Sequence, residues 1–118
     1  MRTQPDKPII WLKAEIKTPP FSPAGRLEAG LLLRRLQRGE VLGLPQSKPM
    51  PVIGTRCHEL RIPDREHSWR IVYYVADDAI VILEVFSKKT QSTPLQEINL
   101  CKKRLAAFMS AAADRETP

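Results

Sequence analysis

Three strand-like runs, joined by two short polar connections, constrain the fold of this chain more than any other feature. The runs are Arg56–Ile62, Ser68–Ala76 and Ala79–Phe86. They are rich in Val, Ile and Tyr and poor in Gly and Pro, which is typical of strands in a sheet. Asp77–Asp78 predicts a two-residue hairpin turn between the second and third runs, because aspartate tolerates the positive φ of such turns. The sequence therefore predicts an antiparallel three-stranded meander.

This hairpin turn also predicts a register. If Ala76 pairs with Ala79, the pairs farther along the two strands are Tyr74–Val81, Val72–Leu83 and Arg70–Val85. The loop of the first hairpin, roughly Pro63–His67, leaves its register open by one residue, and one choice puts Arg61 opposite Arg70. Two arginines side by side repel each other unless an anion lies between them.

Two helices are predicted to flank the meander. The first spans about Pro23–Arg38, with Ser22 as N-cap, proline at the first position and Gly39 as the stop. Its apolar positions at helical spacing are Leu27, Leu31, Leu32 and Leu36. The second helix follows the cap Thr93, with Pro94 at its first position and Gln96 completing a capping box. Its apolar face comprises Ile98, Cys101, Leu105, Phe108 and Ala112.

The remaining segments complete the predicted architecture. Pro8–Ala14 is a short apolar run that predicts an edge strand, because proline cannot donate to a central ladder. Val41–Gly54 holds three prolines and two glycines and predicts an ordered loop. Residues 1–7 and 114–118 are expected to fray. We therefore expect one α+β domain over residues 1–118, a small twisted antiparallel sheet of 3–4 strands packed against both helices.

Charge and cysteine content limit the environment and the partners. The 118 residues include 19 Lys and Arg against 13 Asp and Glu, a net charge of +6, so an anionic partner is expected. Nucleic acid is the first candidate and an acidic protein the second, while a charged solubilising surface is the alternative. Cys57 and Cys101 fall in apolar patterns and are expected to be buried free thiols in a reducing compartment. With neither a long apolar run nor a signal-peptide core, the cytoplasm is the expected location.

No metal-ligand spacing, glycine-rich phosphate loop or Ser–His–Asp order is present in the sequence. His58 shares strand parity with Leu60 and Ile62, which favours a partly buried histidine over a catalytic one. Glu59 is either a base or, as favoured here, a partner for one of the strand arginines. The basic candidates for nucleic-acid contact are Arg34, Arg35, Lys48 and Arg56. For the two helix arginines, a solvated helix end is an equally good interpretation.

Several strings in a fixed order resemble one known family. They are AGRLEAGLLLRRLQRGE, KPMPVIG, CHELRIPD, WRIVYYV, VFSKKT followed by STP, and CKKRL, within about residues 8–108. Together they resemble the phage-derived branch of the RelE/HigB toxins of type II toxin–antitoxin pairs. The resemblance implies a RelE-like microdomain that cleaves mRNA, usually on the ribosome, without a cofactor. It also implies inhibition by a cognate helix-turn-helix antitoxin.

The resemblance also implies site residues. Arg70 matches the strand arginine that contacts the scissile phosphate, Arg61 the arginine closing the preceding strand, and Lys88 and Lys89 the basic pair after the last strand. In a metal-free ribonuclease the 2′-hydroxyl attacks the adjacent phosphate, and fixed arginines meet the charge that develops. A lysine crowded by other cations has its charged form disfavoured and so suits the base.

The sequence also offers further candidate site residues and two alternative functions. Tyr73 or Tyr74 would help to position the base or the phosphate, and His58 is the alternative acid or base. Related toxins of the ParE type inhibit DNA gyrase and cut nothing, so that target is the first alternative. The other is a non-catalytic nucleic-acid-binding module, or a decayed toxin that only binds its antitoxin.

Overall fold

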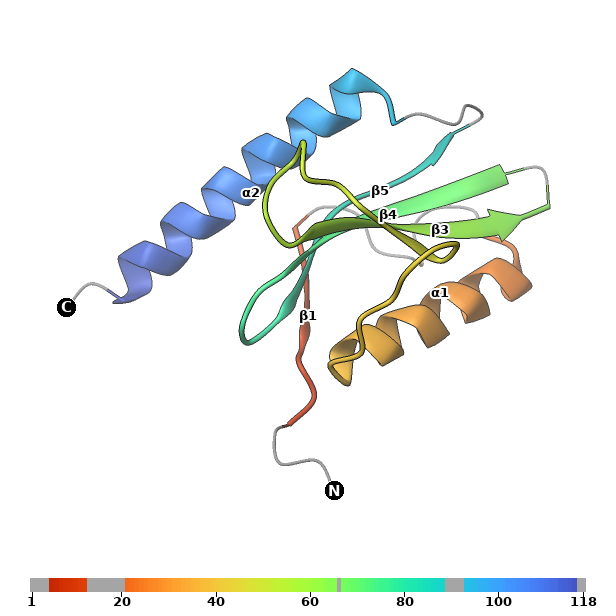
Figure 1. Cartoon of the computed structure of the whole chain (residues 1–118), viewed down its shortest axis with the longest axis horizontal. Helices are drawn as coiled ribbons and strands as arrows, with labels where there is room; N and C mark the ends of the chain where they lie inside the picture. The colour runs from red at the N-terminus through yellow and green to blue at the C-terminus, as the bar shows by residue number, and fades with distance from the viewer. Residues whose placement is uncertain (1–4, 13–20, 66, 89–92, 117–118) are drawn as a thin grey trace.

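A five-stranded sheet lies between two helices in the computed structural model, which describes residues 5–12, 21–65, 67–88 and 93–116 (Figure 1). The strands are β1 (Ile9–Trp11), β2 (Ser47–Pro49), β3 (Cys57–Asp64), β4 (His67–Val75) and β5 (Ile80–Lys88), in the order β1-β5-β4-β3-β2. The helices are α1 (Pro23–Gln37) and α2 (Leu95–Glu116). They cover opposite faces of the sheet, so the molecule has three layers (Figure 1).

The predicted meander is confirmed, with one correction to its register. Tyr74 pairs with Val81 as predicted, and Ala76 N donates to Ala79 O at 2.9 Å across the hairpin turn. A β-bulge between Val72 and Tyr73 then shifts the pairing, so Val72 lies opposite Glu84 and Arg70 opposite Phe86. The predicted pairs Val72–Leu83 and Arg70–Val85 are therefore wrong by one residue. The bulge lets Leu83 join the core beneath α2 while Glu84 Oε1 lies 3.3 Å from Arg104 Nη1 on that helix.

The α+β class is confirmed, but the sheet is larger than predicted and mixed rather than antiparallel. β1 runs parallel to β5 at one edge of the sheet, where a proline just before the strand is tolerated. Residues 13 and 14 of the predicted strand lie outside the described part of the chain. β2 forms the other edge, pairing with β3 from within the segment predicted as a loop. Three residues that include a proline give no period-2 pattern from which a strand can be predicted.

Helix α1 begins and ends as its capping residues predict. Ser22 Oγ accepts a hydrogen bond from Gly25 N at 3.0 Å, and Gly39 adopts a φ of +92° just beyond the helix. The buried positions are Gly25, Ala29, Leu32, Leu33 and Leu36. Leu27 and Leu31 are instead 65% and 54% exposed, so the predicted apolar face is partly wrong. Five leucines in this helix span more than one face, and packing against the sheet selects which are buried.

Helix α2 starts two residues after Thr93 and extends farther than expected. Its backbone begins at Leu95, and Pro94 O accepts from the amides of Glu97 and Ile98. Four of the five residues of the predicted apolar face are confirmed: Cys101 and Leu105 are buried, and Ile98 and Phe108 pack against the same core, whereas Ala112 is only partly buried and lies outside it. Residues 114–116, expected to fray, form the last turn of the helix. No helix in the part of the chain that the structure describes is long and apolar enough to cross a membrane.

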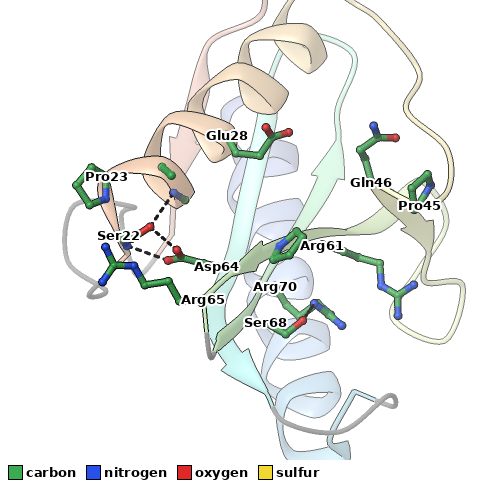
Figure 2. Close-up of a pocket in the computed structure, with 13 residues that line it drawn as sticks. Ser22, Pro23, Glu28, Pro45, Gln46, Arg61, Asp64, Arg65, Ser68 and Arg70 are labelled. Carbon is green, nitrogen blue, oxygen red and sulfur yellow. Dashed lines mark hydrogen bonds between the residues drawn. The ribbon is translucent and has the colours of Figure 1, made fainter.

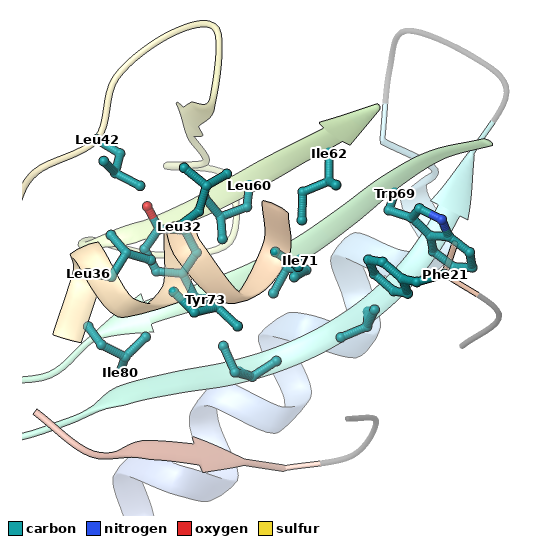
Figure 3. Close-up of a cluster of buried hydrophobic side chains, with 14 residues drawn as sticks. Phe21, Leu32, Leu36, Leu42, Leu60, Ile62, Trp69, Ile71, Tyr73 and Ile80 are labelled. Carbon is teal, nitrogen blue, oxygen red and sulfur yellow. The ribbon is translucent and has the colours of Figure 1, made fainter. Parts of the chain in front are cut away.

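Each face of the sheet has its own core. Leu32, Leu36, Leu60, Ile71 and Tyr73 belong to the cluster between the sheet and α1 (Figure 3). The second cluster lies beneath α2 and contains both cysteines, which are free thiols as predicted. Burial raises the pKa of Cys57 to about 11 and that of Cys101 to about 12. Both thiols therefore stay protonated and unreactive at neutral pH.

Asp64, the last residue of β3, is hydrogen-bonded to Ser22 at the start of α1. Its carboxylate accepts from Ser22 N at 2.8 Å, from Ser22 Oγ and, at 3.1 Å, from Trp69 Nε1. These hydrogen bonds, those from Ser22 most strongly, hold the pKa of Asp64 below its usual value. A β-carbon on Gly25 would lie only 2.6 Å from the Asp64 carboxylate. Glycine is therefore required there for close approach, not for backbone freedom.

We predict that Gly25→Ala destabilises the fold by about 1–3 kcal/mol, because the new methyl group must displace Asp64 from its hydrogen bonds. Gly30→Ala on the same helix is the matched control, since a β-carbon added there would meet nothing within 4 Å. That control is expected to gain up to about 1 kcal/mol from helix propensity. Urea unfolding of both variants measures the difference, and equal effects would contradict the proposed role of Gly25.

Candidate functional site

Two arginines lie directly opposite each other on neighbouring strands at one end of the sheet. Arg61 of β3 pairs with Arg70 of β4, which confirms one of the two registers left open by the sequence. Directly opposed residues of an antiparallel pair project from the same face, here the face that α2 covers farther along. Arg70 is buried, at 6% exposure, whereas Arg61 is half-buried. Burial lowers the pKa of Arg70, the charge of Glu59 opposes this effect, and the charge of Arg61 adds to it.

Glu59 neutralises Arg70, as the sequence favoured. Its Oε1 lies 3.3 Å from Arg70 Nε, and the two side chains are only 1% and 7% exposed. The hydroxyl of Thr93, just before α2, donates to Glu59 Oε2. Arg70 Nη1 donates to Ser68 Oγ at 2.5 Å and to Trp69 O at 3.2 Å. Contacts with Glu59, Ser68 and the carbonyl of Trp69 therefore fix the orientation of the Arg70 guanidinium.

Arg61 differs from Arg70 in having an uncompensated charge. Among the described residues, no carboxylate forms an ion pair with its guanidinium. Its backbone is fixed, because Arg61 N donates to Gln46 O at 2.8 Å. Of the two paired arginines, Arg61 is thus the one whose charge remains available to a ligand, with the rigid Arg70 beside it.

A pocket of about 840 Å³ surrounds the edge of β3 at this point. β2 pairs with His58, Glu59 and Leu60, and beyond Arg61 no strand in the described part of the chain pairs with that edge. The lining side chains include Ser22, Glu28, Gln46, Arg61, Asp64, Arg65, Ser68 and Arg70, together with three prolines. In Figure 2, Arg61, Arg70 and Ser68 lie below the strands, and Glu28 and Gln46 lie above them. Within the described ranges, no three His, Cys, Asp or Glu side chains are grouped so as to hold a metal ion.

The predicted lysine pair lies at the boundary of the described chain. Lys88 is the last residue of β5, and its backbone pairs with Ser68, two residues before Arg70. The β5 strand therefore ends at the same end of the sheet as the arginine pair. Lys89 lies outside the described residues.

Two predicted site residues lie apart from the arginines. His58 stacks on Tyr73 with ring centroids 5.3 Å apart and lines a second cavity, of about 260 Å³, beneath α1. It is partly buried, as predicted, and burial lowers its pKa. Tyr74 is four residues from Arg70 along β4, about 13 Å, and its ring packs edge-on against Phe108 at 6.3 Å. The structure therefore does not bring His58 or Tyr74 together with the arginine pair.

Most of the predicted nucleic-acid-binding residues are paired with carboxylates. The ion pairs are Arg34–Asp6 at 3.5 Å, Arg35–Glu40 at 3.0 Å and Arg56–Asp77 at 2.9 Å. Arg34 and Arg35 belong to the last turn of α1, whereas the first turns of that helix line the pocket. Lys48 is exposed on β2 opposite Glu59, so it shares the arginine face of the sheet. Of the four candidates, Lys48 alone lies on that face beside the site.

Besides Arg61 and Arg70, six polar residues line the pocket, and none of them was identified as a site residue from the sequence: Ser22, Glu28, Gln46, Asp64, Arg65 and Ser68. Ser68 orients Arg70, and its position two residues earlier on the same strand was an available signal. Glu28 and Gln46 line the same pocket from α1 and from the loop before β2. No local pattern marks these two residues, because only the tertiary fold brings them to the edge of β3.

A protein-family model matches most of this chain. The family model for "Phage derived protein Gp49-like (DUF891)" matches residues 20–106, which include α1, the strands from β2 to β5 and the first half of α2. No match was found among curated proteins. The chain therefore belongs to the Gp49-like family of phage-derived proteins, one of the RelE/ParE-like toxin families.

Proposed function

We propose that this protein is the toxin of a type II toxin–antitoxin pair and that it cleaves mRNA on the ribosome by attack of a 2′-hydroxyl on the adjacent phosphate. The observation that carries the proposal is the arginine pair, in which the unneutralised Arg61 lies beside the buried Arg70 at an open pocket. Like charges placed side by side favour an anion between them. A phosphate of the RNA backbone supplies that anion.

Each arginine has a distinct role in the proposed reaction. Arg61 binds the scissile phosphate through its planar guanidinium and stabilises the extra negative charge of the phosphorane. Arg70, fixed by Glu59 and Ser68, presents a second donor group without any need to reorganise. Because Arg70 is positioned before substrate arrives and the backbone of Arg61 is fixed beside it, the transition state gains more from this pair than a solvated lysine would provide.

The base and the acid are proposed to come from the lysine pair. Lys88 ends the strand that lies next to Arg70, and Lys89 follows it in the chain. Cations nearby disfavour the charged form of a lysine, which makes it a better base for the 2′-hydroxyl. Glu59 does not fit this role, because its carboxylate neutralises Arg70 and is only 1% exposed. The partners of this toxin would be mRNA on the ribosome and a cognate helix-turn-helix antitoxin.

Mapping of mRNA ends in a translating extract tests the proposal. Addition of the purified protein is expected to produce new ends at defined codons within minutes, and the cognate antitoxin is expected to prevent them. A ParE-like toxin would instead leave mRNA intact and block supercoiling by purified gyrase. Intact mRNA in the extract would therefore overturn the nuclease proposal, whichever result gyrase gives.

A further inference from the structure

The pocket at the edge of β3 has two chemically different sides. One side carries Arg61 and Arg70, and the other carries the carboxylate of Glu28 and the amide of Gln46 (Figure 2). Glu28 is exposed on α1, and within the described chain no Lys or Arg forms an ion pair with it. A carboxylate repels a phosphate, so the Glu28 side is unsuited to the RNA backbone. It must face another part of any bound nucleotide.

Three prolines add apolar surface to the lining of the pocket. Pro23, Pro45 and Pro63 come from α1, the loop before β2 and β3, and all three line the pocket. Their saturated rings carry no side-chain hydrogen-bonding groups, so they offer apolar surface suited to contact with an unstacked base. The volume of about 840 Å³ is also within the range of roughly 300–1,000 Å³ of pockets that hold small molecules. The pocket therefore has room for a whole nucleotide, not only for a phosphate.

We propose that the Glu28 side of the pocket receives one unstacked base of the RNA and selects bases with an exocyclic amino group over uracil. This base site rests on the proposed function, because it places the phosphate next to that base at Arg61. In single-stranded RNA the Watson–Crick edges of the bases are available for such reading. Gln46 adds an amide that donates to a ring nitrogen or carbonyl oxygen beside the amino group.

The selection follows from the hydrogen-bonding capacity of a carboxylate. An ionised glutamate only accepts hydrogen bonds, and cytosine, adenine and guanine all offer it an amino group. Uracil offers a single N–H flanked by two carbonyl oxygens, which the carboxylate repels. The pocket thus excludes uracil by repulsion as well as favouring the other bases by attraction.

Binding of short deoxyoligonucleotides tests the base site without requiring cleavage, because a strand lacking the 2′-hydroxyl cannot react. Fluorescence anisotropy at low salt would compare pentamers of deoxycytidine and deoxyuridine, two pyrimidines of similar size and stacking. We expect the wild type to bind the cytidine pentamer about tenfold more tightly, within the roughly 5- to 150-fold range of one specific base contact. Glu28→Gln should reduce this ratio to about twofold, because glutamine donates to the carbonyl of uracil.

Glu40→Gln is the matched control. Glu40 is also exposed and follows the same helix, but it pairs with Arg35 away from the pocket, so its removal should leave the ratio unchanged. Equal binding of both pentamers by the wild type, with affinity that depends on Arg61, would overturn base selection and leave the proposed function intact. A ratio that survives Glu28→Gln would likewise overturn the role of Glu28. Absence of all oligonucleotide binding would overturn both proposals.

Discussion

Arg70→Ala is expected to destabilise the fold by about 3–5 kcal/mol, because it leaves the carboxylate of Glu59 buried without its cation. That is a large part of the roughly 5–15 kcal/mol by which a domain of this kind is stable. The pair is almost fully buried, at 7% and 1% exposure, so solvent screening does not reduce the effect. Chemical denaturation followed by circular dichroism at 222 nm measures the change.

A double-mutant cycle separates the ion pair from the packing of the arginine chain. Glu59→Gln combined with Arg70→Met removes both charges while keeping similar volumes, and this double variant is expected to be more stable than Arg70→Met alone. The cycle gives the coupling free energy between the Glu59 and Arg70 side chains. Additive effects in the cycle would show that Glu59 and Arg70 do not stabilise each other.

This prediction changes how loss of toxicity in an Arg70 variant should be interpreted. A variant that unfolds is harmless for reasons unrelated to chemistry. Activity lost in Arg70→Ala therefore counts toward a catalytic role only when the folded fraction has been measured. Arg61 is the better residue for a test of the site, because it is half-buried and forms no ion pair with a described residue.

Arg61→Ala is expected to slow mRNA cleavage about 10²- to 10³-fold, the usual effect of removing one preorganised group that stabilises transition-state charge. Stability should change by less than about 1 kcal/mol, because removal of a repulsive neighbour of Arg70 partly offsets the lost packing. The rate of appearance of new mRNA ends in a translating extract measures the effect. Arg61→Lys should recover only part of the rate, because lysine keeps the charge but not the two-pronged hydrogen bonding.

Arg35→Ala provides the control for this experiment. Arg35 is an exposed arginine that pairs with Glu40 at the far end of α1, so its loss changes the net charge equally without altering the pocket. The control should cleave mRNA at a rate close to that of the wild type. If Arg61→Ala retains a rate close to that of the control, the phosphate does not bind at Arg61.

The elements of the fold follow largely from local features of the sequence. Runs rich in Val, Ile and Tyr and the turn at Asp77–Asp78 predict β4 and β5, and Ser22 and Gly39 mark the ends of α1. The pairing of Arg61 with Arg70 was likewise one of the registers that the sequence left open. Strand period, turn chemistry and capping act over a few residues, so a single sequence is sufficient to read them.

The tertiary structure decided the features that depend on segments far apart in the chain. The bulge opposite Val72 depends on packing beneath α2. β1 and β2 pair with the two outer strands of the meander, β5 and β3. The buried pair of Arg70 and Glu59 also contacts the segment just before α2, where the Thr93 hydroxyl donates to the Glu59 carboxylate. The pocket likewise joins Glu28 of α1 to Arg61 of β3, two positions with the whole of β2 between them in the chain. Such contacts arise from the free energy of packing the whole chain, which no local pattern of residues specifies.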